Sequence, residues 1–277
     1  MKVAIAHAPL ANRKPTLERL LAQLAPQNVE VHIQRSRRME HAAIWSYRLW
    51  EWCEAQDDDC ILLNDDVFVS PDLVTACRII CDLPTSPIVA LHTSVPEAKP
   101  LADAGGRWLR AYWQTGPGYL FKRGAASPLL DYVARLPWKF RSSYNEDNVS
   151  QHFAWEKQEP FHSTIPALVL HDTNVPSSLA YDNHPNRTTC VPWTNYPHAN
   201  LADVARWREG LDTAPYVSNP WMSEQYMEQV RRGLRMQHPC DLCFQREAVV
   251  GHMHSNICGG CLGTMVSTVF QTAEVRQ

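Results

Sequence analysis

Apolar segments of strand length alternate with segments of helical periodicity along the first 170 residues. Short apolar runs, some alternating at period two, predict strands. They lie at residues 3–6, 29–33, 60–63, 87–91, within 112–123 and at 165–171. Apolar residues at helical spacing predict helices at 15–21, 39–53, 73–81 and 125–136. This alternation predicts an α/β fold: a mostly parallel sheet with helices on both faces.

The pattern changes after residue 172. Residues 173–200 are rich in Pro, Asn and Thr and show no period, which predicts a long loop or arm. Helices are expected near 200–211 and 221–236, and a cysteine-rich stretch follows. We therefore expect three parts: an α/β domain at 1–172, an arm with a helical extension at 173–237, and a small module at 238–277.

Composition narrows the function classes. Of 277 residues 45% are hydrophobic and 20% charged, as in a globular protein. The net charge of -3 gives no global basic field, so a nucleic-acid partner would need a local patch. No apolar run reaches the roughly 18 residues of a membrane span, and the N-terminal segment is too short and polar for a signal peptide, so we expect no membrane partner and a cytoplasmic location.

Four cysteines near the C-terminus form two C-x-x-C pairs, Cys240 with Cys243 and Cys258 with Cys261. Four thiolates spaced in this way predict a tetrahedral Zn(II) site. Because all four positions are filled by protein, the default role is structural. Because basic residues lie nearby, a nucleic-acid-binding zinc ribbon is an alternative role. His252 and His254, just before the second cysteine pair, give a faint resemblance to HNH nucleases.

Two adjacent carboxylates, Asp65 and Asp66, follow the apolar strand at 60–63. Ligands of open α/β sheets bind beyond the carboxyl ends of strands. Carboxylates there can hold a hard divalent cation, which would neutralise a diphosphate leaving group. The alternative is an acidic strand-to-loop transition without a ligand.

Four features of the first domain occur in a fixed order. They are Asn64-Asp65-Asp66 after a strand, the Gly116-Pro117-Gly118 turn, the Glu146-Asp147 pair, and an apolar strand that ends at His171. This order resembles GT-A-type glycosyltransferases, nucleotide-sugar enzymes with a short acidic metal motif, over residues 1–172. The resemblance implies a GT-A (Rossmann-like) catalytic domain, a nucleotide-sugar donor with UDP favoured, and a Mn(II) or Mg(II) ion.

The same resemblance implies roles for individual residues. Asp66, Asp65 and His171 would hold the metal. Asn64 stands where the family motif has Asp and could hydrogen-bond the donor ribose. The implied donor-binding residues are His7, Ala8, Arg37, Asn64, Asp65, Gly116 and Gly118. Arg13 and Arg35 are further candidates to reach the donor phosphates. The alternative role of Gly116 and Gly118 is to form an ordinary tight turn.

The Glu146-Asp147 pair matches the acidic pair of inverting members of the family, so inversion is expected by analogy. There one carboxylate removes a proton from the acceptor hydroxyl. We favour Asp147 over Glu146 as this catalytic base. Helix capping is the alternative role of Asp147.

A zinc module fused to a transferase suggests a large acceptor. Bacteriophage glycosyltransferases that modify hydroxymethylated pyrimidines in DNA offer a family context, which implies DNA as a partner and the host cell cytoplasm as the location. One alternative is a zinc-ribbon nucleic-acid-binding or nuclease protein whose α/β domain is a scaffold. Another is a nucleotidyltransferase, but no Gly-rich phosphate loop lies near the N-terminus.

Overall fold

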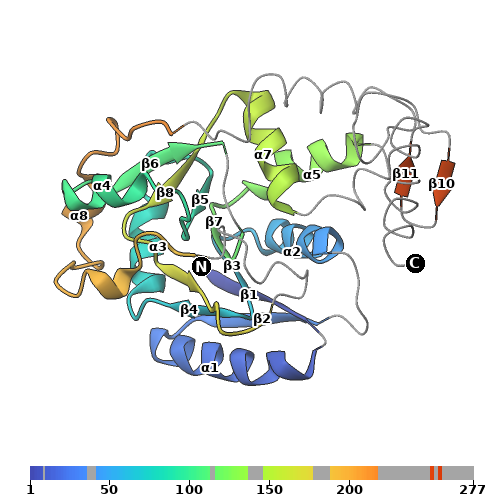
Figure 1. Cartoon of the computed structure of the whole chain (residues 1–277), viewed down its shortest axis with the longest axis horizontal. Helices are drawn as coiled ribbons and strands as arrows, with labels where there is room; N and C mark the ends of the chain where they lie inside the picture. The colour runs from blue at the N-terminus through green and yellow to red at the C-terminus, as the bar shows by residue number, and fades with distance from the viewer. Residues whose placement is uncertain are drawn as a thin grey trace, which may run out of the picture.

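A seven-stranded sheet forms the centre of the molecule in the computed structural model (Figure 1). The structure describes residues 1–8, 10–35, 42–112, 116–136, 146–176, 188–217, 250–252 and 255–257. In spatial order the strands are β2 (Glu30–Arg35), β1 (Lys2–His7), β3 (Cys60–Asn64), β7 (Gly118–Phe121), β5 (Ile88–Ala90), β8 (Phe161–Thr164) and β6 (Trp108–Ala111). Two further antiparallel pairs join β4 (Val67–Val69) to β9 (Val169–His171) and β10 (Val250–His252) to β11 (Ser255–Ile257).

The sheet is mixed. β1 runs parallel to β2 and β3, and β5 runs parallel to β8. β7 is antiparallel to both of its neighbours, β3 and β5, and β6 is antiparallel to β8. The α/β prediction is confirmed, and five of the seven strands run in the same direction. β6 and β7 run opposite to the other five strands, a departure that apolar periodicity does not predict because it identifies strands without fixing their direction.

Helices cover both faces of the sheet, as the sequence predicts. The described α-helices are α1 (Lys14–Leu24), α2 (Ala42–Gln56), α3 (Leu73–Cys81), α4 (Ala98–Asp103), α5 (Ala126–Arg135), α7 (Glu146–Lys157) and α8 (Val204–Arg208). Short 3-10 turns lie at η1 (Ala11–Arg13), η2 (Ala25–Gln27) and η4 (Trp193–Asn195). Within these ranges, no helix combines the length and the apolar character that crossing a bilayer requires.

The alternation of side chains along the strands divides the core into two layers. In β3, Ile61 and Leu63 join the apolar cluster that contains residues of α1 and α3. Cys60 and Leu62 join the cluster that contains residues of α2, α5 and α7. In Figure 1, α1 lies below β1 and β2 in the view and α2 lies above them. The central strands are therefore buried on both faces.

One predicted strand is shorter than expected and gains an unexpected partner. The sequence predicts a strand over 165–171, but only Val169–His171 forms β9. Pro166 has no N–H to donate to a ladder, and Ala167 instead donates its N–H to Val191 O at 2.8 Å. β9 pairs with β4, a strand that the sequence did not predict, and His171 lies opposite Val67. This pairing brings His171 next to the residues that follow β3.

Part of the chain beyond residue 172 packs on the core. The fully buried Trp207 of α8 receives a hydrogen bond at its carbonyl from Trp108 Nε1 at 2.8 Å. Its own Nε1 donates to Leu201 O at 2.8 Å. α8 is shorter than the helix predicted at 200–211. The helix predicted at 221–236 lies outside the described residues.

A half-buried histidine makes the stability of this core depend on pH. Ser86 donates its N–H to His162 Nδ1 at 2.9 Å, and the His162 ring meets the ring of Trp108 edge-on. Burial, together with the charges of Arg110 and Lys122, lowers the pKa of His162 to about 4. The folded protein therefore holds this imidazole neutral.

We predict that His162 lowers the free energy of unfolding as the pH falls. Between about pH 7 and about pH 5 the unfolded chain takes up a proton here and the folded protein does not, so the free energy of unfolding should drop by about 1–2 kcal/mol. His162→Asn should remove that part of the pH dependence, measured by urea unfolding at both pH values. His198→Asn, at an exposed histidine, is the matched control. An unchanged pH dependence in His162→Asn would contradict the prediction.

Candidate functional site

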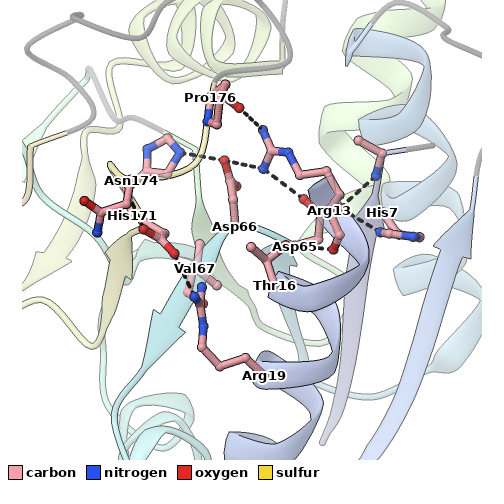
Figure 2. A network of polar contacts seen from close by, with 12 residues as sticks. His7, Arg13, Thr16, Arg19, Asp65, Asp66, Val67, His171, Asn174 and Pro176 are labelled. Carbon is pink, nitrogen blue, oxygen red and sulfur yellow. Dashed lines mark hydrogen bonds and ion pairs between the residues drawn. The ribbon is translucent and has the colours of Figure 1, made fainter. Parts of the chain in front are cut away.

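Three chain segments end beside one another at one edge of the fold. β1 ends at His7 and β3 at Asn64, and the two strands pair in parallel with Ala6 opposite Asn64. β9 reaches the same place through its pairing with β4. Figure 2 shows the polar network that results, with Asp65 and Asp66 at its centre. Local strand pairing thus gathers residues that are far apart in the sequence.

Asp65 is buried and accepts hydrogen bonds on both carboxylate oxygens. His7 Nδ1 donates to its Oδ2 at 2.7 Å, and the backbone N–H of Ala8 donates to the same oxygen at 2.9 Å. Arg13 Nη1 donates to Oδ1 at 3.2 Å. Burial raises the pKa of Asp65, although the Arg13 charge and the His7 hydrogen bond oppose that rise. Asp65 therefore fastens the loop after β1 to the end of β3.

Asp66 is also buried, and its carboxylate contacts the side chains of Arg13 and His171. Its Oδ2 lies 2.5 Å from Arg13 Nη1 and 3.0 Å from His171 Nε2. Its carbonyl accepts the N–H of Asp172 at 2.8 Å. Burial alone would raise the pKa of Asp66, but His171 and Arg13 outweigh burial and lower that pKa to about 2. Asp66 is therefore ionised throughout the neutral pH range.

Arg13 lies between the two carboxylates and is almost fully buried, with 2% of its surface exposed. It ends η1, directly before α1, and Thr16 of α1 donates its hydroxyl to Arg13 O at 2.8 Å. Arg13 Nη2 donates to the carbonyl of Pro176 at 3.0 Å. The sequence suggested that Arg13 reaches donor phosphates, and the structure pairs its guanidinium with the two acids (Figure 2).

A second ion pair extends the network, and sequence reasoning missed it. Arg19 of α1 lies 2.7 Å from Asp172, which directly follows His171. The guanidinium carbon of Arg19 also sits 3.8 Å from the centre of the Phe68 ring, so the cation is held over an aromatic face. Apolar periodicity gives no signal for this pair, because it forms only once α1 packs beside the end of β9.

This network of polar contacts, here called the acidic cluster, holds more carboxylates than guanidinium groups. Three buried carboxylates, Asp65, Asp66 and Asp172, face two guanidinium groups, Arg13 and Arg19. The three carboxylates and two guanidinium groups sum to a charge of about -1. A bound cation would balance the cluster.

The glycine turn lies next to this cluster. The backbone N–H of Asn64 donates to Pro117 O at 3.0 Å. Gly116 and Asn64 line a small cavity of about 20 Å³, enough for one water. A side chain at Gly118 would bring its Cβ within 2.8 Å of Val169 Cγ2. Glycine at this position is thus required by the close passage of β9 over β7.

Other predicted site residues lie outside what the structure describes. Arg37 and the cysteines of the predicted zinc site are among the residues that it leaves out. Glu146 and Asp147 are the first two residues of α7, whose backbone is described there and whose side chains are not. The acidic pair therefore opens a helix, and its role stays a prediction.

Part of this site fits a divalent cation. Among the described side chains, no three His, Cys, Asp or Glu form a ready cation cage. Asp66 Oδ2 and His171 Nε2 are nevertheless 3.0 Å apart, and neighbouring ligands of an octahedral ion at about 2.1 Å are separated by about 3 Å. The pair fits two adjacent ligand positions once Arg13 leaves Asp66 Oδ2. Asp65 fits less well, because protein donors occupy both of its oxygens.

Comparisons with known proteins give distant structural likenesses. No family model and no curated protein sequence matches the chain. A glucose-1-phosphate thymidylyltransferase-like structure from Bacillus anthracis shares 11% identity at a TM-score of 0.43, over 68% of this chain and 95% of that one. A glycosyltransferase involved in glycosylation of the major capsid of PBCV-1 shares 14% identity at 0.33, over 68% and 92%.

A Drosophila β-1,4-galactosyltransferase 7, in complex with manganese, UDP-Gal and xylobiose, shares 15% identity at a TM-score of 0.28, over 47% of this chain and 52% of that one. These three structures are described as transferases. All three TM-scores lie below 0.5, so the likenesses assign no family. The function has to be argued from the residues of the site.

We predict that Asp65→Asn destabilises the protein by about 2–4 kcal/mol, because it leaves a buried guanidinium short of its counter-charge. Urea unfolding of the purified variant measures the loss. Asp103→Asn makes the same chemical change in an exposed i,i+4 pair with Lys99 and should have little effect. Equal unfolding midpoints for the two variants would show that Asp65 does not anchor the fold.

Proposed function

We propose that this protein is a glycosyltransferase that moves a sugar from a nucleotide-sugar donor, a UDP-sugar by preference, to an acceptor hydroxyl. The observation that carries the proposal is the 3.0 Å contact between Asp66 Oδ2 and His171 Nε2. The two residues are 105 positions apart in the sequence, and they are the positions that the resemblance pairs as metal ligands. Their meeting supports the assignment of a donor site to this edge of the sheet.

Asp66 and His171 would hold a Mn(II) or Mg(II) ion in this proposal. When bound, the ion supplies positive charge that stabilises the departing diphosphate. The negative balance of the cluster favours a cation there. When Asp66 binds the ion, Arg13 would lose this carboxylate but keep its hydrogen bonds to Asp65 and to Pro176 O.

The loop after β1 would meet the nucleotide. Asp65 holds the backbone N–H of Ala8 and the ring of His7, so these two groups are positioned before a ligand arrives. Preordered contacts lower the entropy cost of binding. Asn64 and the turn at Gly116 lie next to this loop and would line the binding site of the donor sugar.

Asp147 would act as the base and Glu146 as its neighbour. The first turn of a helix favours a negative charge, and an ionised carboxylate is what the reaction needs. Asp147 takes the proton of the acceptor hydroxyl, the acceptor oxygen forms a bond to the anomeric carbon, and the bond from that carbon to the diphosphate oxygen breaks. The anomeric centre inverts when attack and departure occur on opposite sides.

We further propose a hydroxymethylated pyrimidine in DNA as the acceptor, with the predicted structural zinc site at Cys240, Cys243, Cys258 and Cys261 stabilising a module that meets the DNA. The sequence support is the pairing of a transferase-like domain with this module. A base in a duplex must be unstacked to reach a buried site. The competing proposal is a zinc-ribbon nucleic-acid-binding or nuclease protein, in which the acidic cluster only stabilises the α/β domain.

Turnover separates the two proposals. With Mn(II) present, we expect the wild-type protein to release UDP from a UDP-sugar, faster with hydroxymethylated than with unmodified duplex DNA. Asp66→Asn and His171→Ala should each lower that rate by about 100-fold or more, because each removes a ligand of the cation. Asp147→Asn should lower it similarly through loss of the base.

Asp103→Asn is the matched control and should keep the wild-type rate, since Asp103 pairs only with the exposed Lys99 among described residues. Chelation with EDTA should stop turnover, and Mn(II) should restore it. DNA cleavage or DNA binding that persists in Asp66→Asn, with no UDP release by the wild type, would replace the transferase proposal with the zinc-ribbon alternative.

A further inference from the structure

A second cavity lies apart from the acidic cluster, between α4, α8 and the connection from β8 to β9. Its volume is about 300 Å³. Apolar walls come from Ala102, Ile165 and Pro166, and Tyr196 adds an aromatic side chain. It shares no lining residue with the acidic cluster. Small-molecule pockets begin at about this volume and combine apolar walls with a few polar groups.

The charged residues that line this cavity are all basic. Arg107 and Arg206 line it, His198 lies at its exposed rim, and none of its lining residues is acidic. Concave sites lined by one sign of charge concentrate ligands of the opposite sign. The lining therefore selects an anion.

The two arginines are incompletely paired. Arg206 Nη2 donates to Ile165 O at 3.1 Å, and within the described part of the chain Arg206 makes no ion pair. Arg107 Nη1 donates to Gly105 O, and its Nη2 has only a long contact of 3.5 Å to Glu209, whose side chain is 67% exposed. The Nε atoms of both arginines are buried and have no hydrogen-bond partner among the described residues. These guanidinium groups keep hydrogen-bonding capacity that an anion could use on their Nη atoms.

Electrostatics at Arg206 point the same way. Burial, followed by the charge of the neighbouring Arg107, lowers the pKa of Arg206 to about 10, although Glu209 and Asp203 oppose this shift. Arginine stays protonated in proteins, so the shift marks an unfavourable position for a cation. An anion between the two guanidiniums would relieve their repulsion. The guanidinium fork matches the oxygens of a phosphate group.

We propose that this cavity binds a small molecule that carries a phosphate group, with Arg107 and Arg206 contacting the phosphate and the walls at Ile165 and Pro166 contacting the rest. The volume of about 300 Å³ favours a small molecule over a nucleic-acid strand, which binds along an extended basic groove. This site is independent of the donor site at Asp66.

Calorimetric titration of the full-length protein tests the proposal with three probes: ribose 5-phosphate, inorganic phosphate and neutral ribose. Ribose 5-phosphate should bind at millimolar concentration or tighter, and ribose should not bind. Binding of inorganic phosphate alone also supports the site, because the phosphate is the recognised group. Arg206→Gln and Arg107→Gln should each weaken binding by about tenfold or more.

Arg208→Gln is the matched control, because Arg208 is exposed on the same helix as Arg206, and it should bind like the wild type. Arg206→Lys keeps the charge without the fork and should bind with intermediate affinity, which guards against misfolding of Arg206→Gln. Asp66→Asn should bind ribose 5-phosphate normally, so failure of the donor site would leave this result unchanged.

Three results would overturn the proposal. One is an equal affinity of Arg206→Gln and wild type for ribose 5-phosphate. Another is the absence of binding to both phosphate probes at millimolar concentration. The third is tighter binding of a single-stranded DNA oligonucleotide that Arg206→Gln abolishes, which would assign the cavity to a nucleic-acid backbone.

Discussion

The guanidinium of Arg13 between Asp65 and Asp66 is the interaction on which the arrangement of this site depends. Two carboxylates removed from water at the end of a central strand would strongly destabilise the fold without a partner. Arg13 lies within 3.2 Å of one and 2.5 Å of the other. Because Arg13 also holds Pro176 O, one buried cation joins the start of α1, the end of β3 and the segment after β9.

That arrangement also makes the site chemically adaptable. Asp65 is fully committed to protein donors, whereas Asp66 shares one oxygen between Arg13 and His171. An incoming cation therefore competes with Arg13 for Asp66 alone, and the anchoring by Asp65 persists. The same protein carries an opposite arrangement in the cavity at Arg107 and Arg206, where fixed positive charge lacks full partners. The two places are suited to ligands of opposite sign.

Sequence patterns anticipated the parts of the fold that depend on local periodicity. The apolar run at 60–63 predicted β3, because a strand that is buried on both faces is apolar throughout. The acids that follow the run were therefore expected just beyond the end of this strand, where Asp65 and Asp66 lie. Helix α3 lies at Leu73–Cys81, where the spacing placed it. The antiparallel course of β7 was not predictable, because apolar periodicity identifies a strand without fixing its direction.

Partners that depend on tertiary contact were also beyond the sequence. The pairing of β4 with β9 is set by where two short segments meet, and it decides that His171 lies at Asp66. Arg13 reads as an ordinary surface arginine until its burial between the acids is known. The ion pair of Arg19 with Asp172 joins α1 to the residue after β9, so it required the fold first. The base at Asp147 and the zinc cysteines stay predictions from the sequence.

A crystal structure of the protein with Mn(II) and UDP would test the proposed role of Asp66 and His171. We expect an ion bound by Asp66 and His171, UDP beside the loop after His7, and Arg13 withdrawn from Asp66 while still bonded to Asp65. An Arg13–Asp66 ion pair that stays intact, with the ion and the nucleotide bound elsewhere, would contradict it.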